Sequence, residues 1–348
     1  MLLTALVLAP LPARAQEQPD DLFDLSLEDL LEIEIVSVGV LGSHTHLKGE
    51  WMVGFKFMLM SMDGNFTGSD RTTTEAVLGS YMVSPLAMTM QMQMVDVMFA
   101  PSDALTLMVM IPYHRLSMDH RTRASMEFTA ESSGVGDVGV QALFSVFGNI
   151  SRSGFSSSPW GRHRILLRGG FTLPTGSINA RDDLPAGPDQ KLPYPMQVGS
   201  GTLSLVPGIV YLGQSGRWAW EVESSASVHL GSNDSGYALG DRLSTTLSGT
   251  REISNFASVS ARGTMRNWRN ITGADSDLNP MMVPTADPAL RGGRRLDLGL
   301  GFSTYLPFGG LNKSLRVSFE AGLPIYQRLD GPQLGNDLHF MIGSSWTF

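Results

Sequence analysis

The chain has 348 residues, of which 42% are hydrophobic and 17% charged, and its formal net charge is −8. It contains no cysteine, which excludes disulfide scaffolds, cysteine-based zinc sites and thiol catalysis, and the negative charge argues against a nucleic-acid partner. The composition is too apolar for a disordered chain, yet no internal apolar run approaches the roughly 20 residues of a membrane helix. Methionine is abundant, since 14 of the 20 methionines lie between Met52 and Met126.

The start of the chain has the pattern of an export signal. Residues 2–9 (LLTALVLA) form a short apolar run, and Ala13-x-Ala15 is a small-residue cleavage motif. We therefore predict a signal peptide over residues 1–15, with the mature chain beginning near Gln16. The alternative interpretation is an N-terminal core strand.

Residues 16–48 form an acidic segment that differs from the rest of the chain. Leu27, Leu30, Leu31 and Ile33 are spaced to line one face of a short helix. The stretch LSLEDLLEIEIVSV resembles the segment just after the signal peptide in many TonB-dependent outer-membrane receptors. No plug domain of sufficient length follows it. We therefore predict a short periplasmic cap or tether, with a periplasmic partner contacting residues 19–38.

From residue 49 onward, apolar and polar residues alternate with the period of a β-strand. Between residues 51 and 61 the odd positions are mainly large and apolar, from Trp51 onward, whereas the even positions hold methionines and Lys56. The pattern recurs at 86–100 and 105–118. In all three stretches the methionines share a face with a polar group, namely Lys56, Asp96 or His114. In a membrane barrel the wholly apolar face contacts lipid, so we predict that the methionines point into the lumen.

Nine further strands follow, near 134–147, 162–174, 201–213, 217–230, 241–253, 256–269, 293–306, 314–327 and 336–348. Short and long connections alternate along the chain. The short ones lie at 101–104, 214–216, 254–255 and 307–313, and the longer ones include 63–85, 119–133, 175–200 and 270–292. The connection at 148–161 is an exception, because it is long where a short turn is expected. This is the pattern of a bacterial outer-membrane protein. We predict an all-β fold: a transmembrane, antiparallel, up-and-down barrel of about 12 strands (10–14) over residues 49–348, in contact with outer-membrane lipid. A soluble β-sandwich or propeller is the alternative.

The last strand carries Phe340, Ile342, Trp346 and Phe348 at alternate positions. This ending resembles the signal by which outer-membrane barrels are assembled, and it implies recognition of Phe348 by the barrel-assembly machinery. The stretches GEWMVGFKFMLMSMDGN, MTMQMQMVDVMFAPSDALTLMVMIPY, SGVGDVGV, LPTGSI, LPYPMQVGSG, NPMMVPTADP and LPIYQRLDGPQL resemble a family of Met-rich outer-membrane barrels labelled transporters. That family is related to barrel proteins assigned to the phenol meta-pathway. The resemblance implies an outer-membrane channel and no settled substrate.

No enzyme motif is present. The sequence lacks G-x-S-x-G, H-E-x-x-H and the P-loop, and its seven histidines are scattered. We therefore predict a protein that is not an enzyme and that requires no cofactor.

The methionine array carries the sharpest functional hypothesis. Thioethers are soft, uncharged donors that favour Cu(I), and many weak sites suit conduction. Long Met side chains on neighbouring strands can share one ion, because strands lie about 4.8 Å apart. The candidate ligands of a transient Cu(I) ion are Met58, Met60, Met62, Met88, Met90, Met92, Met94, Met108, Met110, His114, Met118 and His120. His44-x-His46, just before the first strand, is either a metal entry site or a pair of solvated histidines.

Two other interpretations of the methionines stay open. Met is an adaptable apolar lining that suits hydrophobic or aromatic solutes, and it can also serve as an oxidant sink. We therefore expect a channel for a small solute, first copper and alternatively hydrophobic or aromatic compounds; a structural or envelope-stress barrel without transport is the third option. The expected lumen charges are Lys56, Asp96, Glu221, Glu223, Arg295, Arg316 and Glu320.

Overall fold

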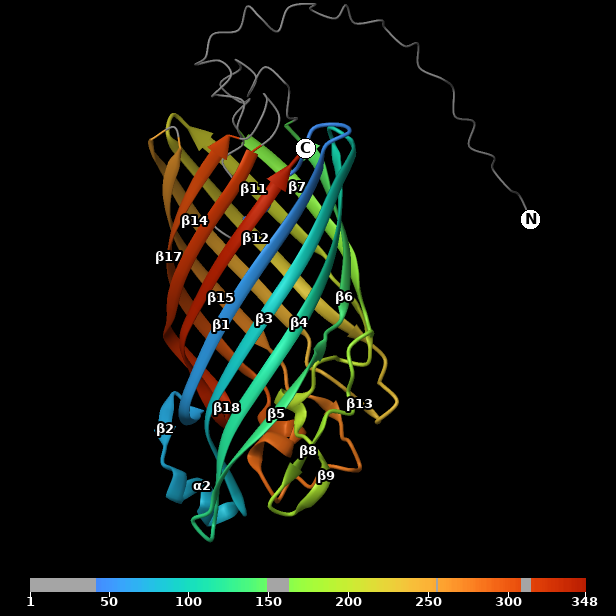
Figure 1. The fold of residues 1–348 in the computed structure, drawn as a ribbon, viewed down its shortest axis with the longest axis vertical. Coiled ribbons are helices and arrows are strands. Elements are labelled where there is room, and N and C mark those ends of the chain that lie inside the picture. Colours follow the sequence, from blue (N-terminus) through green and yellow to red (C-terminus); the bar gives the residue numbers. More distant parts are fainter. Residues whose placement is uncertain (1–41, 149–162, 255, 308–313) are drawn as a thin grey trace, which may run out of the picture.

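Long antiparallel strands form a closed barrel in the computed structural model (Figure 1), which describes residues 42–148, 163–254, 256–307 and 314–348. The wall consists of β1 (Trp51–Gly68), β3 (Val83–Ser102), β4 (Leu105–Thr122), β6 (Val138–Phe147), β7 (His163–Leu173), β11 (Gly208–Ser215), β12 (Trp218–Leu230), β14 (Arg242–Ser254), β15 (Ala257–Trp268), β17 (Gly293–Pro307) and β18 (Ser314–Thr347). Two short strands, β5 (Glu127–Val135) beside β4 and β10 (Leu203–Leu205) beside β12, extend the wall. The predicted signal peptide, the helix near residues 27–33 and all but the first residue of the connection predicted at 148–161 lie outside the described residues.

The strand β18 crosses the wall twice. Its first part pairs with β17, and its last part pairs with β1, which closes the ring. The side chain of Gln327 hydrogen-bonds the backbone N–H and C=O of Asn336, so the two parts lie side by side. The eleven wall elements of the described residues therefore make twelve crossings. This confirms the predicted antiparallel barrel.

Short and long connections lie at opposite ends of the barrel. Turns such as Asp103–Ala104 lie at the end where Trp51 and Phe348 exchange backbone hydrogen bonds of 2.9 Å. The other end carries β2 (Asp70–Thr72), α2 (Thr74–Ser80), β8 (Arg181–Leu184), β9 (Gly187–Lys191), η1 (Tyr194–Met196), β13 (Tyr237–Ala238), β16 (Thr272–Gly273), η2 (Pro284–Ala286) and η3 (Pro288–Leu290). Figure 1 shows α2, β2, β8, β9 and β13 at the end away from the C-terminus. Short turns mark the periplasmic end of such barrels and long loops the outer end.

The long loop predicted at 119–133 is wrong. The strand β4 continues to Thr122 and β5 begins at Glu127, so only a tight turn separates them. Outward positions of β4 change from apolar (Leu107 to Tyr113) to polar from Arg115 onward, while the strand continues. The polar stretch looked like a loop because this part of the wall lies beyond the hydrocarbon.

An apolar belt covers the outward face of the wall. Val53, Phe55, Val95, Leu107 and Ile111 are among its exposed side chains. On β4 the belt runs from Leu105 to Tyr113, a stretch whose nine residues match the length of a tilted transmembrane strand. Closure leaves no unpaired strand edge in lipid, which is the condition for a β-structure to span a membrane. No helix in the described part of the chain is both long and apolar enough to cross a membrane.

The loop between β7 and β10 folds back over the barrel mouth. Asp137, in the break between β5 and β6, accepts hydrogen bonds from Gly176 N (2.9 Å), Ser200 N (2.8 Å) and Ser200 Oγ (2.5 Å). An apolar cluster, which we call the loop cluster, forms where the loop packs on the wall: Met88, Leu116, Met118, Ala130, Leu192, Met196 and Val198. The aspartate and the cluster together hold the loop against the inner wall.

Candidate functional site: the lumen

One side of the lumen is a wall of methionines. The inward residues of β18, β1, β3 and β4 are register partners across neighbouring strands, and directly opposed residues have Cβ atoms about 4.5–5.5 Å apart. From the outer end the rows read Met62–Met88–Met118, His339–Met60–Met90, Met341–Met58–Met92–His114, Lys56–Met94, Asp96–Met110 and Met52–Met98–Met108. We call this set the Met wall. It runs along the barrel axis from the loop cluster to the periplasmic end.

The opposite side of the lumen carries charges that are mostly paired. Arg168 contacts Glu223 at 2.7 Å, Arg262 contacts Glu320 at 3.4 Å, and Arg295 contacts Asp297 at 2.9 Å; Arg266 also contacts Asp297. These residues lie on β7, β12, β15, β17 and β18. On the Met wall itself, Lys56 Nζ lies 2.7 Å from Asp96 Oδ1, and the Asp96 side chain is fully buried. Pairing reduces the cost of placing these charges inside a narrow barrel.

Residues 43–47, which we call the lumen strap, lie inside the periplasmic half of the barrel. Ser43 N lies 3.2 Å from both carboxylate oxygens of Glu221, and Ser43 Oγ donates to Glu223 at 2.7 Å. Arg168 donates to Ser43 Oγ, and Arg164 donates to Thr45 Oγ1, each at 2.6 Å. The last residues of the predicted periplasmic segment, 16–48, thus contact the charged side of the lumen.

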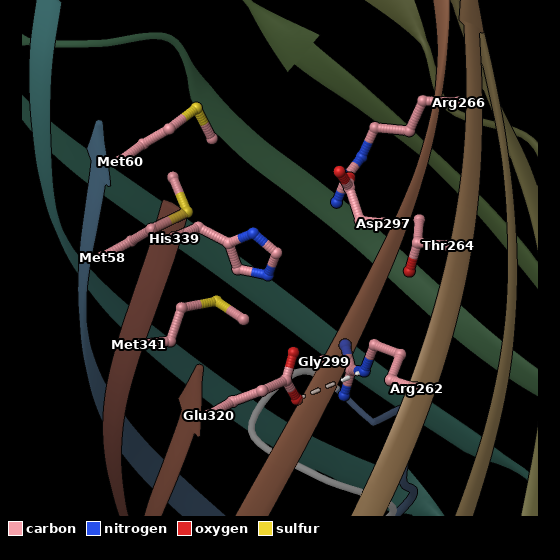
Figure 2. Close-up of a pocket in the computed structure, with 10 residues that line it drawn as sticks. All are labelled: Met58, Met60, Arg262, Thr264, Arg266, Asp297, Gly299, Glu320, His339 and Met341. Carbon is pink, nitrogen blue, oxygen red and sulfur yellow. Dashed lines mark hydrogen bonds and ion pairs between the residues drawn. The ribbon is translucent and has the colours of Figure 1, made fainter. Parts of the chain in front are cut away.

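Cavities lined by described residues follow the lumen. A cavity of about 250 Å³ beside the strap is lined by His44, Met94, Met98, Met108 and Met110 on one side and by arginines and glutamates on the other. A smaller one of about 40 Å³ lies between Met58, Met60, Met341 and His339 and the pairs Arg262–Glu320 and Arg266–Asp297 (Figure 2). A vestibule of about 550 Å³ near the outer mouth includes Met90, His114, Tyr194 and Trp268 in its lining.

The predicted metal ligands fall into separate groups. Met58 and Met60 line the small cavity, Met94, Met108 and Met110 the strap cavity, and Met90 and His114 the vestibule; Met92 lies in register between Met58 and His114. Met62, Met88 and Met118 belong to the loop cluster or pack against it. His120 is buried and stacks on Phe128, with ring centroids 4.9 Å apart. Among the described residues, no group of three or more histidines and acids is arranged to hold a metal.

All seven predicted lumen charges face inward. Lys56 pairs with Asp96, Glu221 and Glu223 contact the strap, Arg295 and Glu320 are paired, and Arg316 donates to Ser303 Oγ at 3.2 Å. His44 and His46, whose role the sequence left open, lie in the strap, with His44 Nε2 3.2 Å from Met52 Sδ.

Sequence reasoning missed several lumen residues. Four arginines lie at the alternate positions of their strands that face the lumen, and this alternation could have identified them. They are Arg164 and Arg168 on β7, and Arg262 and Arg266 on β15. Met341 and His339 were missed for another reason. They join the Met wall only because β18 closes the barrel beside β1.

No protein-family model and no curated protein matches this sequence. Among solved structures, the COG4313 outer membrane channel from Pseudomonas putida F1 aligns over 87% of this chain and 97% of its own, with a TM-score of 0.62 and 12% identity. The transport unit of the autotransporter AIDA-I from Escherichia coli aligns over 88% of this chain and 92% of its own (TM-score 0.44, 10% identity). A Pseudomonas aeruginosa FadL homologue aligns over 86% and 89% (TM-score 0.35, 10% identity).

The first of these likenesses shows a shared fold. Together with ring closure and the apolar belt, it defines the protein as a β-barrel of the bacterial outer membrane. At 12% identity no site residue is transferred from that channel to this chain.

Proposed function

We propose that this barrel is a channel for a small solute and that its solute is a soft metal ion, Cu(I). The observation that carries the proposal is the register of the Met wall, which places thioethers side by side on four neighbouring crossings along the lumen. Thioethers favour Cu(I) over hard cations. Successive weak sites allow an ion to leave each position as readily as it enters.

The choice of Met over Leu supports a role for sulfur. Leu fills apolar space equally well, yet the inward positions of β1 and β3 hold nine methionines and no leucine. The charged residues opposite are largely paired with one another, so they keep the lumen polar without supplying free carboxylates for hard divalent ions.

A channel for small hydrophobic or aromatic compounds is the second candidate, and the vestibule favours it. Its volume of about 550 Å³ is within the range of small-molecule sites, and Tyr194, Trp268 and Met90 line it. Thioether sulfur makes favourable contacts with aromatic rings. The resemblance to barrel proteins assigned to the phenol meta-pathway points the same way.

Transport through lipid vesicles separates these candidates. Vesicles containing the refolded barrel are tested for uptake of Ag(I), Na⁺ and benzoate, Ag(I) serving as a soft ion that is stable in air. We expect Ag(I) uptake to exceed Na⁺ uptake and to fall when Met90, Met92, Met94 and Met110 are all changed to Leu. The matched control changes four exposed methionines, Met126, Met265, Met281 and Met282, to Leu.

The outcomes distinguish the three functions. Uptake of Ag(I) that is equal in both variants and wild type contradicts the copper proposal. Selective uptake of benzoate supports the second candidate, whereas a barrel that passes none of the probes is structural. We further propose, from the sequence, that the protein is not an enzyme, that Phe348 is read by the barrel-assembly machinery and that residues 19–38 meet a periplasmic partner.

A further inference from the structure

Three thioethers and one imidazole gather at the seam where β18 meets β1. Met58 is the register partner of Met341, and Met60 is the partner of His339. Because residues two apart on one strand share a face, these four side chains form a compact patch on the inner wall. Figure 2 shows the four side chains extending from β1 and β18 toward the same small cavity.

His339 supplies the nitrogen donor of this patch. It is 8% exposed, its ring points into the cavity, and its ring nitrogens make no hydrogen bond or ion pair with any residue that the structure describes. A ring nitrogen is therefore left free to bind something inside the cavity.

We propose that Met58, Met60, Met341 and His339 form one binding site for a soft monovalent cation, Cu(I) or Ag(I). This inference rests on the proposed soft-metal channel and assigns it a specific site. All four ligands are neutral, three are soft sulfurs and one is a borderline imidazole nitrogen, which is a donor set for Cu(I). The cavity volume of about 40 Å³ exceeds the space that one water molecule needs, and a single ion fits there.

The opposite side of the cavity selects against divalent ions. Glu320 is paired with Arg262, and Asp297 is paired with Arg266 and Arg295, so both carboxylates are already engaged. These five groups carry three positive and two negative charges. Coulomb repulsion scales with ionic charge, so a divalent ion meets twice the repulsion that Cu(I) meets. The thioethers and the imidazole thus favour soft ions, and the charged groups opposite them disfavour divalent ions.

Equilibrium binding to the detergent-solubilised full-length barrel tests the site. Cu(I) is titrated under reducing conditions against a chromogenic chelator, and Ag(I) and Zn(II) are titrated separately. The site variant is Met58→Leu, Met60→Leu and Met341→Leu together. The matched control changes three exposed methionines outside the Met wall, Met126→Leu, Met265→Leu and Met281→Leu, because Met-to-Leu exchanges conserve volume and are tolerated best.

We expect the site variant to bind Cu(I) roughly tenfold more weakly or worse, and the control to bind like wild type. His339→Gln should remove the nitrogen signal from the X-ray absorption spectrum of bound Cu(I) while the sulfur signal stays. Equal binding by the site variant and wild type overturns the site, as does equal loss in the control.

Binding and transport give independent answers. If Cu(I) binding needs the four residues but the vesicles take up no Ag(I), the binding site is supported and the channel is refuted. Cu(I) binding that survives loss of these residues, together with Ag(I) uptake that falls in the Met90, Met92, Met94 and Met110 variant, refutes the site and keeps the channel.

Discussion

Replacing Ser43 by Ala should release the lumen strap. The Ser43 hydroxyl donates to Glu223 and accepts from Arg168, and both partners are charged. A hydrogen bond to a charged group contributes about 1.5–3 kcal/mol. Arg168 and Glu223 stay paired with each other without the hydroxyl, so we count one such bond. Because 1.4 kcal/mol is a factor of ten, the ratio of docked to undocked strap should fall about 10- to 100-fold.

The absence of cysteine makes this change measurable. A single cysteine introduced as Thr45→Cys is the only thiol in the protein, and residue 45 is 2% exposed in the docked strap. Its rate of labelling by a maleimide therefore reports undocking. We expect Ser43→Ala to raise that rate about 10- to 100-fold, since labelling follows the undocked population.

The control is Ser61→Ala, in the same Thr45→Cys background. Ser61 lies on the outward side of β1, where its register partner Leu338 is exposed, so its hydroxyl has no part in the strap. The control should label like the parent. Equal labelling rates with and without the Ser43 hydroxyl would refute the view that these contacts hold the strap in the lumen.

Three further predictions concern charge, loop and pH. Lys56→Met should lower the free energy of unfolding in urea by about 3–5 kcal/mol, because it leaves the buried Asp96 carboxylate unpaired, and adding Asp96→Leu should restore most of it; an unchanged midpoint in the single variant would contradict this. Asp137→Ala should free the loop that it holds and speed proteolysis at residues 181–190, while intact resistance would show that the apolar contacts suffice. Burial raises the pKa of Tyr237 from 10 to about 12. The phenol therefore stays protonated in the folded outer loops at a pH where it would ionise in the unfolded chain. Its contribution to the stability of the loops is complete below pH 10 and is lost as the pH rises to 12. Tyr237→Phe should remove that decline in a protease-resistance profile.

The fold was predictable because strand alternation is local. Phe55 and Lys56 are adjacent, and their opposite polarity alone assigns one to lipid and the other to the lumen. The same logic predicts Asp96 and Glu320 on the lumen side, and in the structure both side chains are buried beside Lys56 and Arg262. Closure is not local, since β1 and the end of β18 are nearly 300 residues apart in sequence, so the meeting of Met58 with Met341 has no sequence signal.

The strap and the loop cluster were hidden for a different reason. Residues 43–47 have no periodicity, and their place in the lumen depends on hydrogen bonds with residues far away in the sequence, such as Glu221, Glu223 and Arg164. Met88 and Met94 are equivalent in the sequence pattern. They differ in the structure because a loop folds over the first and leaves the second facing a cavity. Such differences depend on tertiary contacts that alternation does not encode.

The continuation of β4 past the apolar belt has a consequence for how the barrel meets the medium. Nine residues follow Tyr113 on this strand, and at about 3.3 Å each with a tilt near 40° they raise the rim by about 20 Å. That height exceeds the headgroup layer on one side of a bilayer. The entrance therefore opens above the lipid, and a dissolved molecule meets protein side chains before it reaches the membrane surface.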